Sequence, residues 1–314
     1  MKIDKKYFAL LLAGVLLSCG KTEEVESTEK TVQEPTKQIQ EHWPNHDLLV
    51  SQVYQDDNVA FYYDGKMDKT ITWPYKTMSD TWAYVRKTYG EFGDDKRLYV
   101  IFHKSEVLNK GTQFEKCITC GGHPASYWDA SHDFRNIIDC GLAGDHDWEI
   151  PTGQDIGIPI HEVGHIVCGA SHGVKGSPSD VLWGDSKFME IFNYDVLRNI
   201  GRKDEADKVY LQMQTTTDVF PRKGTYWFRD WFYPIYSKYG EASVLNKYFA
   251  LLAKEFPKKN GEYTRNLNWG EFIHFWSGAA GADLKEQAKL AFGWSSAWEA
   301  MLKNAKEDFP NVKY

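Results

Sequence analysis

The sequence predicts an α+β protein, in which an N-terminal mixed α/β lobe with a small sheet precedes a mainly helical C-terminal lobe. Two observations predict this order: short aromatic and β-branched runs occur before residue 155, and apolar residues recur at three- and four-residue steps after it. The 314 residues are 42% hydrophobic and 15% aromatic, which is enough for a sizeable core. A formal net charge of -7 without a dense Lys/Arg block argues against a nucleic-acid partner.

The N-terminus predicts an export signal. The stretch "MKIDKKYFALLLAGVLLSCG" combines three early lysines with an apolar run that is too short to span a bilayer. Its end, "LLSCG", resembles the lipobox of bacterial lipoproteins, which implies a signal peptide over residues 1–18 and a lipid anchor on Cys19. The implied location is the cell envelope, with the chain attached to the outer membrane and either periplasmic or surface-exposed. The alternative is a signal for soluble secretion in which Cys19 has no role.

Residues 19–45 are predicted to form a flexible tether, because the stretch "GKTEEVESTEKTVQEPTKQIQE" after Cys19 has no aromatic residue and little apolar content. The α+β lobe is expected over residues 46–154. Within it, "NVAFYYDG" and "RLYVIFHK" predict strands, and "WPYKTMSDTWAYVRKTYG" between them predicts a helix that begins near a proline and ends at a glycine. Residues 104–130 are expected to be a loop, and "HDFRNIIDCG" predicts a further strand.

The helical lobe is expected over residues 155–314 and carries the candidate metal site. Its segments share apolar residues at helical spacing. They are residues 185–201, 203–214, 225–240, 241–256, 268–281 and 295–309. The aromatic stripe "YWFRDWFYPIY" is interpreted as helix core rather than as a sugar-stacking surface.

The stretch "HEVGH", residues 161–165, carries the strongest chemical signal. On a helix, residues four apart lie on one face, so His161 and His165 can bind one metal ion. Imidazole suits Zn2+, and a site with three protein ligands leaves a position for a water whose pKa falls towards 7. Glu162 is then expected to be the general base that takes the proton of this water. The alternative is an ordinary amphipathic helix, since H-E-x-x-H also occurs by chance.

This motif at the start of the helical lobe, together with the export signal, resembles the zincin superfamily of zinc metallopeptidases. The resemblance covers the motif and the order of the lobes. It implies a zincin-like fold with the active-site helix between the lobes, a Zn2+ cofactor, and hydrolysis of a peptide or protein substrate, glycoproteins included. Zincins often hold the substrate backbone along a sheet edge, and "SHDFRNIID", residues 131–139, is expected to form that edge.

Three residues compete as the third zinc ligand. Gluzincins take a carboxylate from a second helix, and Asp185 follows His165 by 20 positions, in the range of thermolysin-like enzymes. A helical wheel that starts at Asp185 places it on the apolar face and Glu190 on the polar side, so Asp185 is preferred. Gluzincins use glutamate, however, and Asp185 has the alternative role of a helix cap. His172 is one position late for the metzincin pattern.

Other roles stay open at the level of the sequence. Tyr194, Tyr226, Tyr236 and His274 are candidates for a side chain that stabilises the transition state. The rival function is a non-catalytic peptide- or glycan-binding lipoprotein on a zincin scaffold, against which the intact Glu162 argues.

The remaining cysteines suggest a second rival. Outside the cytoplasm, four cysteines predict disulfides, and three pairings are open. A structural zinc site or a redox role centred on them is the alternative. The four residues are Cys117, Cys120, Cys140 and Cys168.

Overall fold

The structure is a computed structural model that describes residues 37–105, 107–113, 115–142 and 146–314. The predicted signal peptide over residues 1–18 and the lipidated Cys19 lie outside the described residues. The predicted tether differs from the structure at its C-terminal end, because residues 37–45 are structured and include the strand β1 (Gln38–Gln40). Ile39 in this strand and Trp43 after it are buried against the sheet, which explains why this end of the polar segment is ordered.

Within the described residues, ten strands form one large and two small sheets. Their bounds are β1 (Gln38–Gln40), β2 (Leu49–Gln55), β3 (Val59–Tyr63), β4 (Leu98–His103), β5 (Val107–Leu108), β6 (Lys116–Cys117), β7 (Gly121–Ala125), β8 (Asn136–Gly141), β9 (Lys258–Lys259) and β10 (Glu262–Tyr263). The large sheet has the order β1-β2-β3-β4-β8-β7, while β5 pairs with β6 and β9 pairs with β10. In the large sheet β3, β4 and β8 are parallel, and β7 is an antiparallel edge strand on β8.

The helices mostly follow the sheet in the chain. Their bounds are α1 (Trp73–Tyr89), α2 (Gln154–Ala170), α3 (Asp180–Trp183), α4 (Lys187–Asn199), α5 (Lys203–Met213), α6 (Tyr233–Lys238), α7 (Ala242–Glu255), α8 (Trp269–Ala280), α9 (Lys285–Phe292) and α10 (Ser296–Asp308). Short 3-10 turns lie at Ala130–His132 and Ser171–Gly173, and a π-helical turn, Trp227–Phe232, precedes α6. Among the described residues, no helix combines the length and the apolar character needed to cross a membrane.

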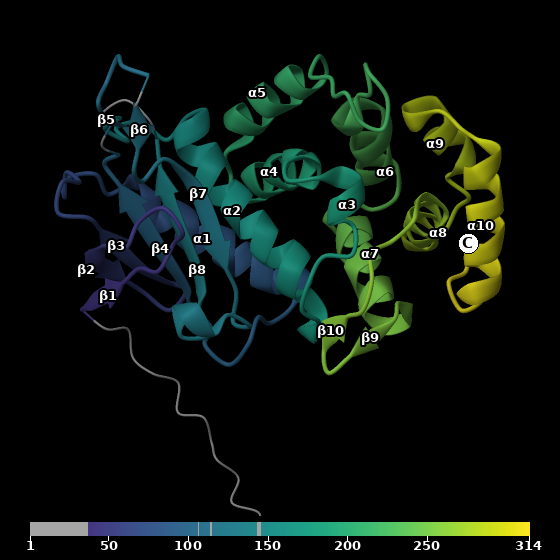
Figure 1. Ribbon diagram of the computed structural model, residues 1–314, viewed down its shortest axis with the longest axis horizontal. Helices are drawn as coiled ribbons and strands as arrows, with labels where there is room; N and C mark the ends of the chain where they lie inside the picture. The colour runs from purple at the N-terminus through teal and green to yellow at the C-terminus, as the bar shows by residue number, and fades with distance from the viewer. Residues whose placement is uncertain (1–36, 106, 114, 143–145) are drawn as a thin grey trace, which may run out of the picture. The chain divides into compact units, whose positions relative to one another are not determined.

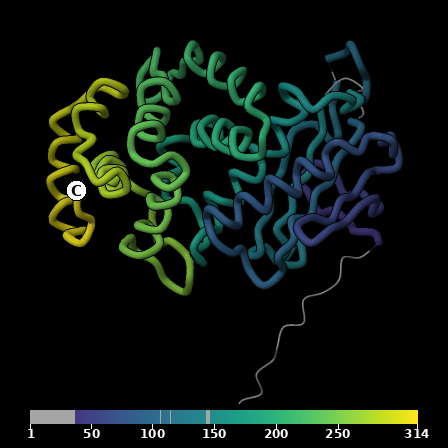
Figure 2. The backbone as a smooth tube through the Cα atoms, turned by 180° about the vertical axis from the view of Figure 1, so that it is seen from behind, coloured from purple at the N-terminus to yellow at the C-terminus, as the bar shows by residue number. Residues whose placement is uncertain are grey.

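The two faces of the large sheet have different surroundings. Side chains alternate between the faces along each strand. Phe61, Val100 and Ile138 pack with α1, α2 and the C-terminal helices in the main hydrophobic core, while Tyr62 and Ile101 belong to a smaller core on the other face, together with Trp43. Figure 1 shows α1 and α2 beside the strands, and Figure 2 shows from behind that the helical half follows on from them. The predicted lobes therefore share one main core.

The predicted α+β class is confirmed, with a mixed sheet and a mainly helical C-terminal half. The predicted strands match β3, β4 and β8, and the first predicted helix matches α1. The prediction of a loop over residues 104–130 is wrong at the short strands β5 and β6 and at β7. The sequence of β7, "GGHPA", contains glycine and proline and no β-branched residue. The aromatic stripe is helix core, as predicted, with Trp227, Trp231 and Phe232 buried.

Candidate active site

The helix α2 presents both motif histidines on one side and packs its apolar residues against the core. Ile160, Val163 and Val167 are buried, whereas the side chains of His161 and His165 keep 23% and 22% of their surface exposed. The imidazole Nε2 atoms of the two histidines lie 3.1 Å apart. The four-residue spacing thus brings two ligand atoms to one point at the surface of the helix, as the sequence predicted.

The carboxylate of Asp185 joins the two histidines. It lies between α3 and α4, with Oδ1 3.2 Å from His165 Nε2 and Oδ2 3.9 Å from His161 Nε2. The three residues each offer one ligand atom, and these atoms lie within 4.8 Å of one another. Ligands about 2.0 Å from one tetrahedral ion are separated by about 3.3 Å, so the donor set fits a three-residue zinc site. That the site binds zinc stays a prediction.

The helical-wheel argument for Asp185 is wrong in its premise, although the residue does lie beside the histidines. The helix α4 begins at Lys187, so Asp185 precedes it, and its side chain is 79% exposed rather than buried. Glu190 does not point to a polar side either: its side chain is only 12% exposed, and Oε1 lies 3.8 Å from Lys187 Nζ. Burial raises the pKa of Glu190 to about 7. The wheel failed for Asp185 because it started the helix two residues early.

The protonation states suit a cation site. Burial lowers the pKa of His161 to about 4 and also lowers the pKa of His165, so both imidazoles are neutral near pH 7, the form that binds metals. Burial raises the pKa of Glu162 to about 8, and the carboxylates of Asp185 and Asp139 add to this shift. A bound divalent cation acts in the opposite direction and favours the ionised carboxylate.

The strand β7 lies against Glu162. A Cβ atom at Gly122 would lie 2.6 Å from Glu162 Cγ and closer still to the carboxyl group, so only glycine leaves room for this side chain. Residues 131–139 do not form the sheet edge that the sequence predicted, because β8 pairs with β4 on one side and with β7 on the other. Among the described residues, β7 has no strand on its outer side, so it is the edge beside the candidate metal site.

Two cavities flank the motif histidines. One, of about 460 Å³, is lined by the end of β7, Trp128 and His165. The other, of about 470 Å³, is lined by the start of α2, His161, Glu190 and part of α5. The two histidines therefore lie between two cavities, one of which adjoins the sheet edge at β7.

The remaining sequence candidates lie elsewhere. His172 is in the turn after α2, where Nε2 lies 2.7 Å from Asn246 Oδ1. Neither cavity is lined by Tyr194, Tyr226, Tyr236 or His274. The Tyr236 hydroxyl donates to Asp195, and His274 contacts Phe309 and Tyr314. The choice among these four candidates therefore stays open.

The cysteines form one disulfide, Cys117–Cys120, and leave Cys140 and Cys168 as buried free thiols. The expected second disulfide is therefore absent from the described residues. Burial raises the pKa of both free thiols well above its ordinary value, which makes them poor nucleophiles. In the described part of the chain, the groups of converging metal-ligand atoms contain no cysteine, which weakens the rival reading of a cysteine-bound zinc.

Sequence reasoning missed a second group of converging ligand atoms, formed by Glu41, His46, His103 and Asp139. A local signal for it exists in "EHWPNHD", residues 41–47, which is unusually rich in metal-ligand side chains for a segment expected to be largely flexible. The other two members come from β4 and β8, so only the fold brings all four together.

The sequence matches no protein-family model and no curated protein.

Proposed function

We propose that this protein is a zinc metallopeptidase of zincin type. The observation that carries the proposal is the convergence of His161, His165 and Asp185 around one point beside the buried carboxyl group of Glu162. Zinc sites with three protein ligands and solvent access are typical of hydrolases, whereas structural zinc sites have four ligands and are closed. The partial exposure of both histidines and the exposed Asp185 agree with the first class.

In this proposal His161, His165 and Asp185 hold the ion, and the zinc supplies Lewis acidity that lowers the pKa of water towards 7. Glu162 takes the proton from the attacking water and returns it to the nitrogen of the departing amine. The position of Glu162 supports this role, because it follows the first ligand in the helix and its carboxyl group is buried at the sheet edge. Burial keeps the carboxylate close to the reacting atoms and away from bulk water.

The proposed substrate is an extended peptide or protein segment, glycoproteins included. Edge strands bind such segments by adding them to the sheet, and β7 offers its outer side next to Glu162. Side chains of the bound segment would enter the two cavities beside His161 and His165. Along this edge, the space beside Gly121 is open, because a Cβ atom there would meet no atom within 4 Å.

The proposed location is the cell envelope, with a lipid on Cys19 holding the protein to the outer membrane. A short polar tail then separates the anchor from the sheet. Replacement of Cys19 by serine is expected to move the protein from the membrane fraction to the soluble fraction, because a lipid chain supplies the insertion energy. Retention of Cys19→Ser in the membrane fraction would contradict the anchor.

The test of the proposed activity compares the wild-type chain with Glu162→Gln and with Glu286→Gln, a control at an exposed position of α9. Each protein is incubated with a mixed peptide library, cleavage is followed by mass spectrometry, and bound zinc is measured. We expect Glu162→Gln to keep its zinc and to lose activity by a factor of roughly 100 to 10,000, while Glu286→Gln behaves as wild type. Full activity in Glu162→Gln would overturn the mechanism. Peptide retention without any cleavage by the wild type would favour the non-catalytic binding lipoprotein.

A further inference from the structure

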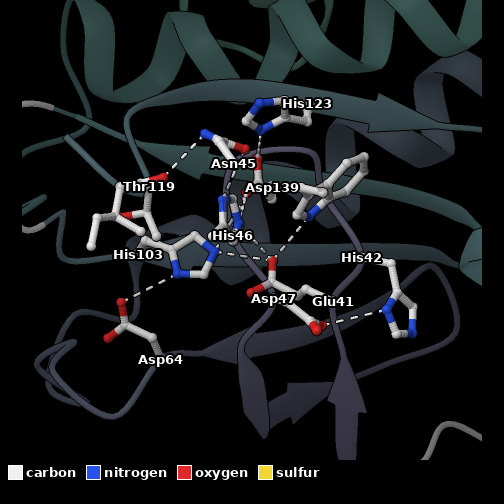
Figure 3. A network of polar contacts seen from close by, with 12 residues as sticks. Glu41, His42, Asn45, His46, Asp47, Asp64, His103, Thr119, His123 and Asp139 are labelled. Carbon is white, nitrogen blue, oxygen red and sulfur yellow. Dashed lines mark hydrogen bonds and ion pairs between the residues drawn. The ribbon is translucent and has the colours of Figure 1, made fainter. Parts of the chain in front are cut away.

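A second group of metal-ligand side chains lies on the face of the sheet opposite α2. We propose that Glu41, His46, His103 and Asp139 bind a divalent metal ion, preferably zinc, in a closed structural site (Figure 3). The group joins the segment after β1 to the ends of β4 and β8. The inference does not depend on the proposed peptidase activity, since it shares no ligand with the candidate active site.

The distances within the group match a four-ligand ion. Glu41 Oε1 lies 3.4 Å from His46 Nε2, which lies 2.7 Å from Asp139 Oδ2. Asp139 Oδ2 lies 3.5 Å from His103 Nε2, and His103 Nε2 lies 3.1 Å from Glu41 Oε1. Four tetrahedral ligands about 2.0 Å from zinc are separated by about 3.3 Å. The four distances above lie around this value, and all four ligand atoms lie within 4.8 Å of one another, close enough to share one ion.

The neighbours of the group fix the ligand tautomer of each histidine. His103 Nδ1 lies 3.2 Å from Asp64 Oδ2, and His46 Nδ1 lies 3.1 Å from Asn45 Oδ1. Both partners are oxygen acceptors, so Nδ1 carries the proton in each ring and the Nε2 lone pair faces the other ligands. Outer partners of this kind orient histidine in metal sites.

The carboxylates have outer partners as well. His123 Nδ1 lies 2.7 Å from the second oxygen of Asp139, and the indole N–H of Trp43 donates to Glu41 Oε1 at 3.0 Å. Figure 3 shows the labelled side chains of the group and their outer partners pointing toward one another from separate elements. These contacts come from the segment after β1 and from β7, so separate parts of the chain orient the two carboxylates.

The ligand atoms are buried and incompletely satisfied. The side chains of all four residues are at most 1% exposed. In the described part of the chain, two of the four ligand atoms, His46 Nε2 and Asp139 Oδ2, make no hydrogen bond even though they are 2.7 Å apart. The other two, His103 Nε2 and Glu41 Oε1, are within hydrogen-bond distance of each other. Close approach without hydrogen-bond geometry is expected when both lone pairs point at a shared ion. Two neutral imidazoles and two carboxylates also make the site neutral once it binds a divalent cation.

The competing arrangement is an ion-pair network without metal. Burial lowers the pKa of His46, but the carboxylates of Asp139 and Glu41 outweigh burial and raise it to about 9. In that arrangement each histidine carries two protons, and burying several charges together is costly unless every donor and acceptor is satisfied. The unsatisfied atoms of the group favour the metal, and a metal assay separates the two arrangements directly.

The location of the group gives it a structural role. Asp139, a member of the group, and its partner His123 point to one face of the sheet. Cys140 and Gly122, the next residues along β8 and β7, point to the other face, toward the helix α2. An ion bound to Asp139 would therefore stabilise the edge strand β7 through His123, on the face of the sheet opposite Glu162. It would also tie down the residues that follow the polar N-terminal segment.

The experiment measures zinc per chain by elemental analysis in the full-length protein and in a His161→Ala/His165→Ala variant that lacks the candidate active site. We expect about two zinc ions in the wild type and about one in this variant. In the variant background, Glu41→Gln should remove the remaining ion, and the control Glu286→Gln should keep it. Circular dichroism shows which samples are folded. A chelator titration of the wild type needs no substitution, and it should release the ion of the candidate active site readily and the buried ion slowly.

Each outcome decides a different proposal. One ion in both the wild type and the double-histidine variant would support the buried site and overturn the proposed active site. One ion in the wild type and none in a folded double-histidine variant would overturn the buried site alone. A folded wild type that binds no zinc after exposure to excess zinc would overturn both.

Discussion

Gly122 and Glu162 are in such close contact that no side chain fits between them: a Cβ atom at Gly122 would lie 2.6 Å from Glu162 Cγ. The contact joins the edge strand β7 to the helix that carries the histidines. It therefore sets where the carboxyl group of Glu162 lies relative to His161 and His165.

Gly122→Ala is expected to displace Glu162 and lower peptide hydrolysis by roughly 100-fold, because small displacements of a catalytic group cost about this much. Zinc content should not change, since the three atoms nearest to such a Cβ all belong to Glu162, which is not a proposed ligand. The measurement is the turnover rate on a peptide identified as a substrate, together with zinc per chain. Gly65→Ala is the matched control, because a Cβ there meets no atom within 4 Å. Equal activity in Gly122→Ala and Gly65→Ala would show that the position of Glu162 does not limit the reaction.

Asp185→Ala is expected to lose the zinc of the candidate active site, because one of three protein ligands is removed. We expect the affinity for this ion to fall by at least about 100-fold, measured by competition with a chromogenic chelator. Asp185→Glu should recover part of it, since the longer carboxylate still reaches the histidines from an exposed position. Glu190→Ala and His172→Ala are the controls and should keep the ion. If Glu190→Ala empties the site while Asp185→Ala does not, the buried carboxyl group of Glu190 is the ligand.

The close packing of α2 on α4 requires glycine at position 164. A Cβ atom there would lie 2.5 Å from Met189 Sδ and 3.0 Å from Phe192 Cδ1, both in the buried core. Gly164→Ala should therefore lower the free energy of unfolding by roughly 1–3 kcal/mol. On the same helix, a Cβ at Gly157 meets no atom within 4 Å, so Gly157→Ala should raise stability by roughly 0.5–1 kcal/mol. Urea unfolding checks both signs, and stabilisation by Gly164→Ala would contradict this packing argument.

The sequence predicted an element correctly where the residues that stabilise it are close together in the chain. β3 and β4 were predictable because consecutive apolar side chains are buried in them, and α1 because its apolar residues recur at helical spacing between a proline and a glycine. The edge strand β7 was not, because its glycines and proline give no strand signal and its pairing with β8 supplies the stabilisation. The pair His161 and His165 followed from helix geometry alone.

The third candidate ligand and the buried group show what local pattern cannot supply. The spacing from His165 pointed to Asp185, but the burial assigned to Asp185 was wrong because this residue precedes α4. The exposure assigned to Glu190 was wrong because Lys187 and α5 lie on the side of α4 that the wheel took as polar. The buried group draws on residues from position 41 to position 139, and parallel pairing of β4 with β8 is what aligns His103 with its partners. Such long-range contacts follow from sheet topology, which a single sequence does not specify.

The buried Asp195 should make stability depend on pH. Its carboxyl group accepts hydrogen bonds from Tyr84 and Tyr236, each at 2.8 Å, and burial raises its pKa from 3.8 to about 6. Because the pKa is higher in the folded state, the protonated form contributes stability that is fully present below about pH 4 and is lost as the pH rises through 6. A shift of this size corresponds to roughly 3 kcal/mol.

Asp195→Asn keeps the shape of the protonated side chain and cannot ionise, so it should remove this dependence. We expect the variant to match the wild type near pH 4 and to be more stable by roughly 3 kcal/mol at pH 8, measured by urea unfolding across this range. The difference between the two proteins isolates Asp195 from every other titrating group, including the metal ligands. Asp207→Asn, at an exposed position of α5, is the control and should run parallel to the wild type. Parallel curves for Asp195→Asn and the wild type would mean that the two tyrosine hydroxyls stabilise the ionised carboxylate well enough to cancel the effect of burial.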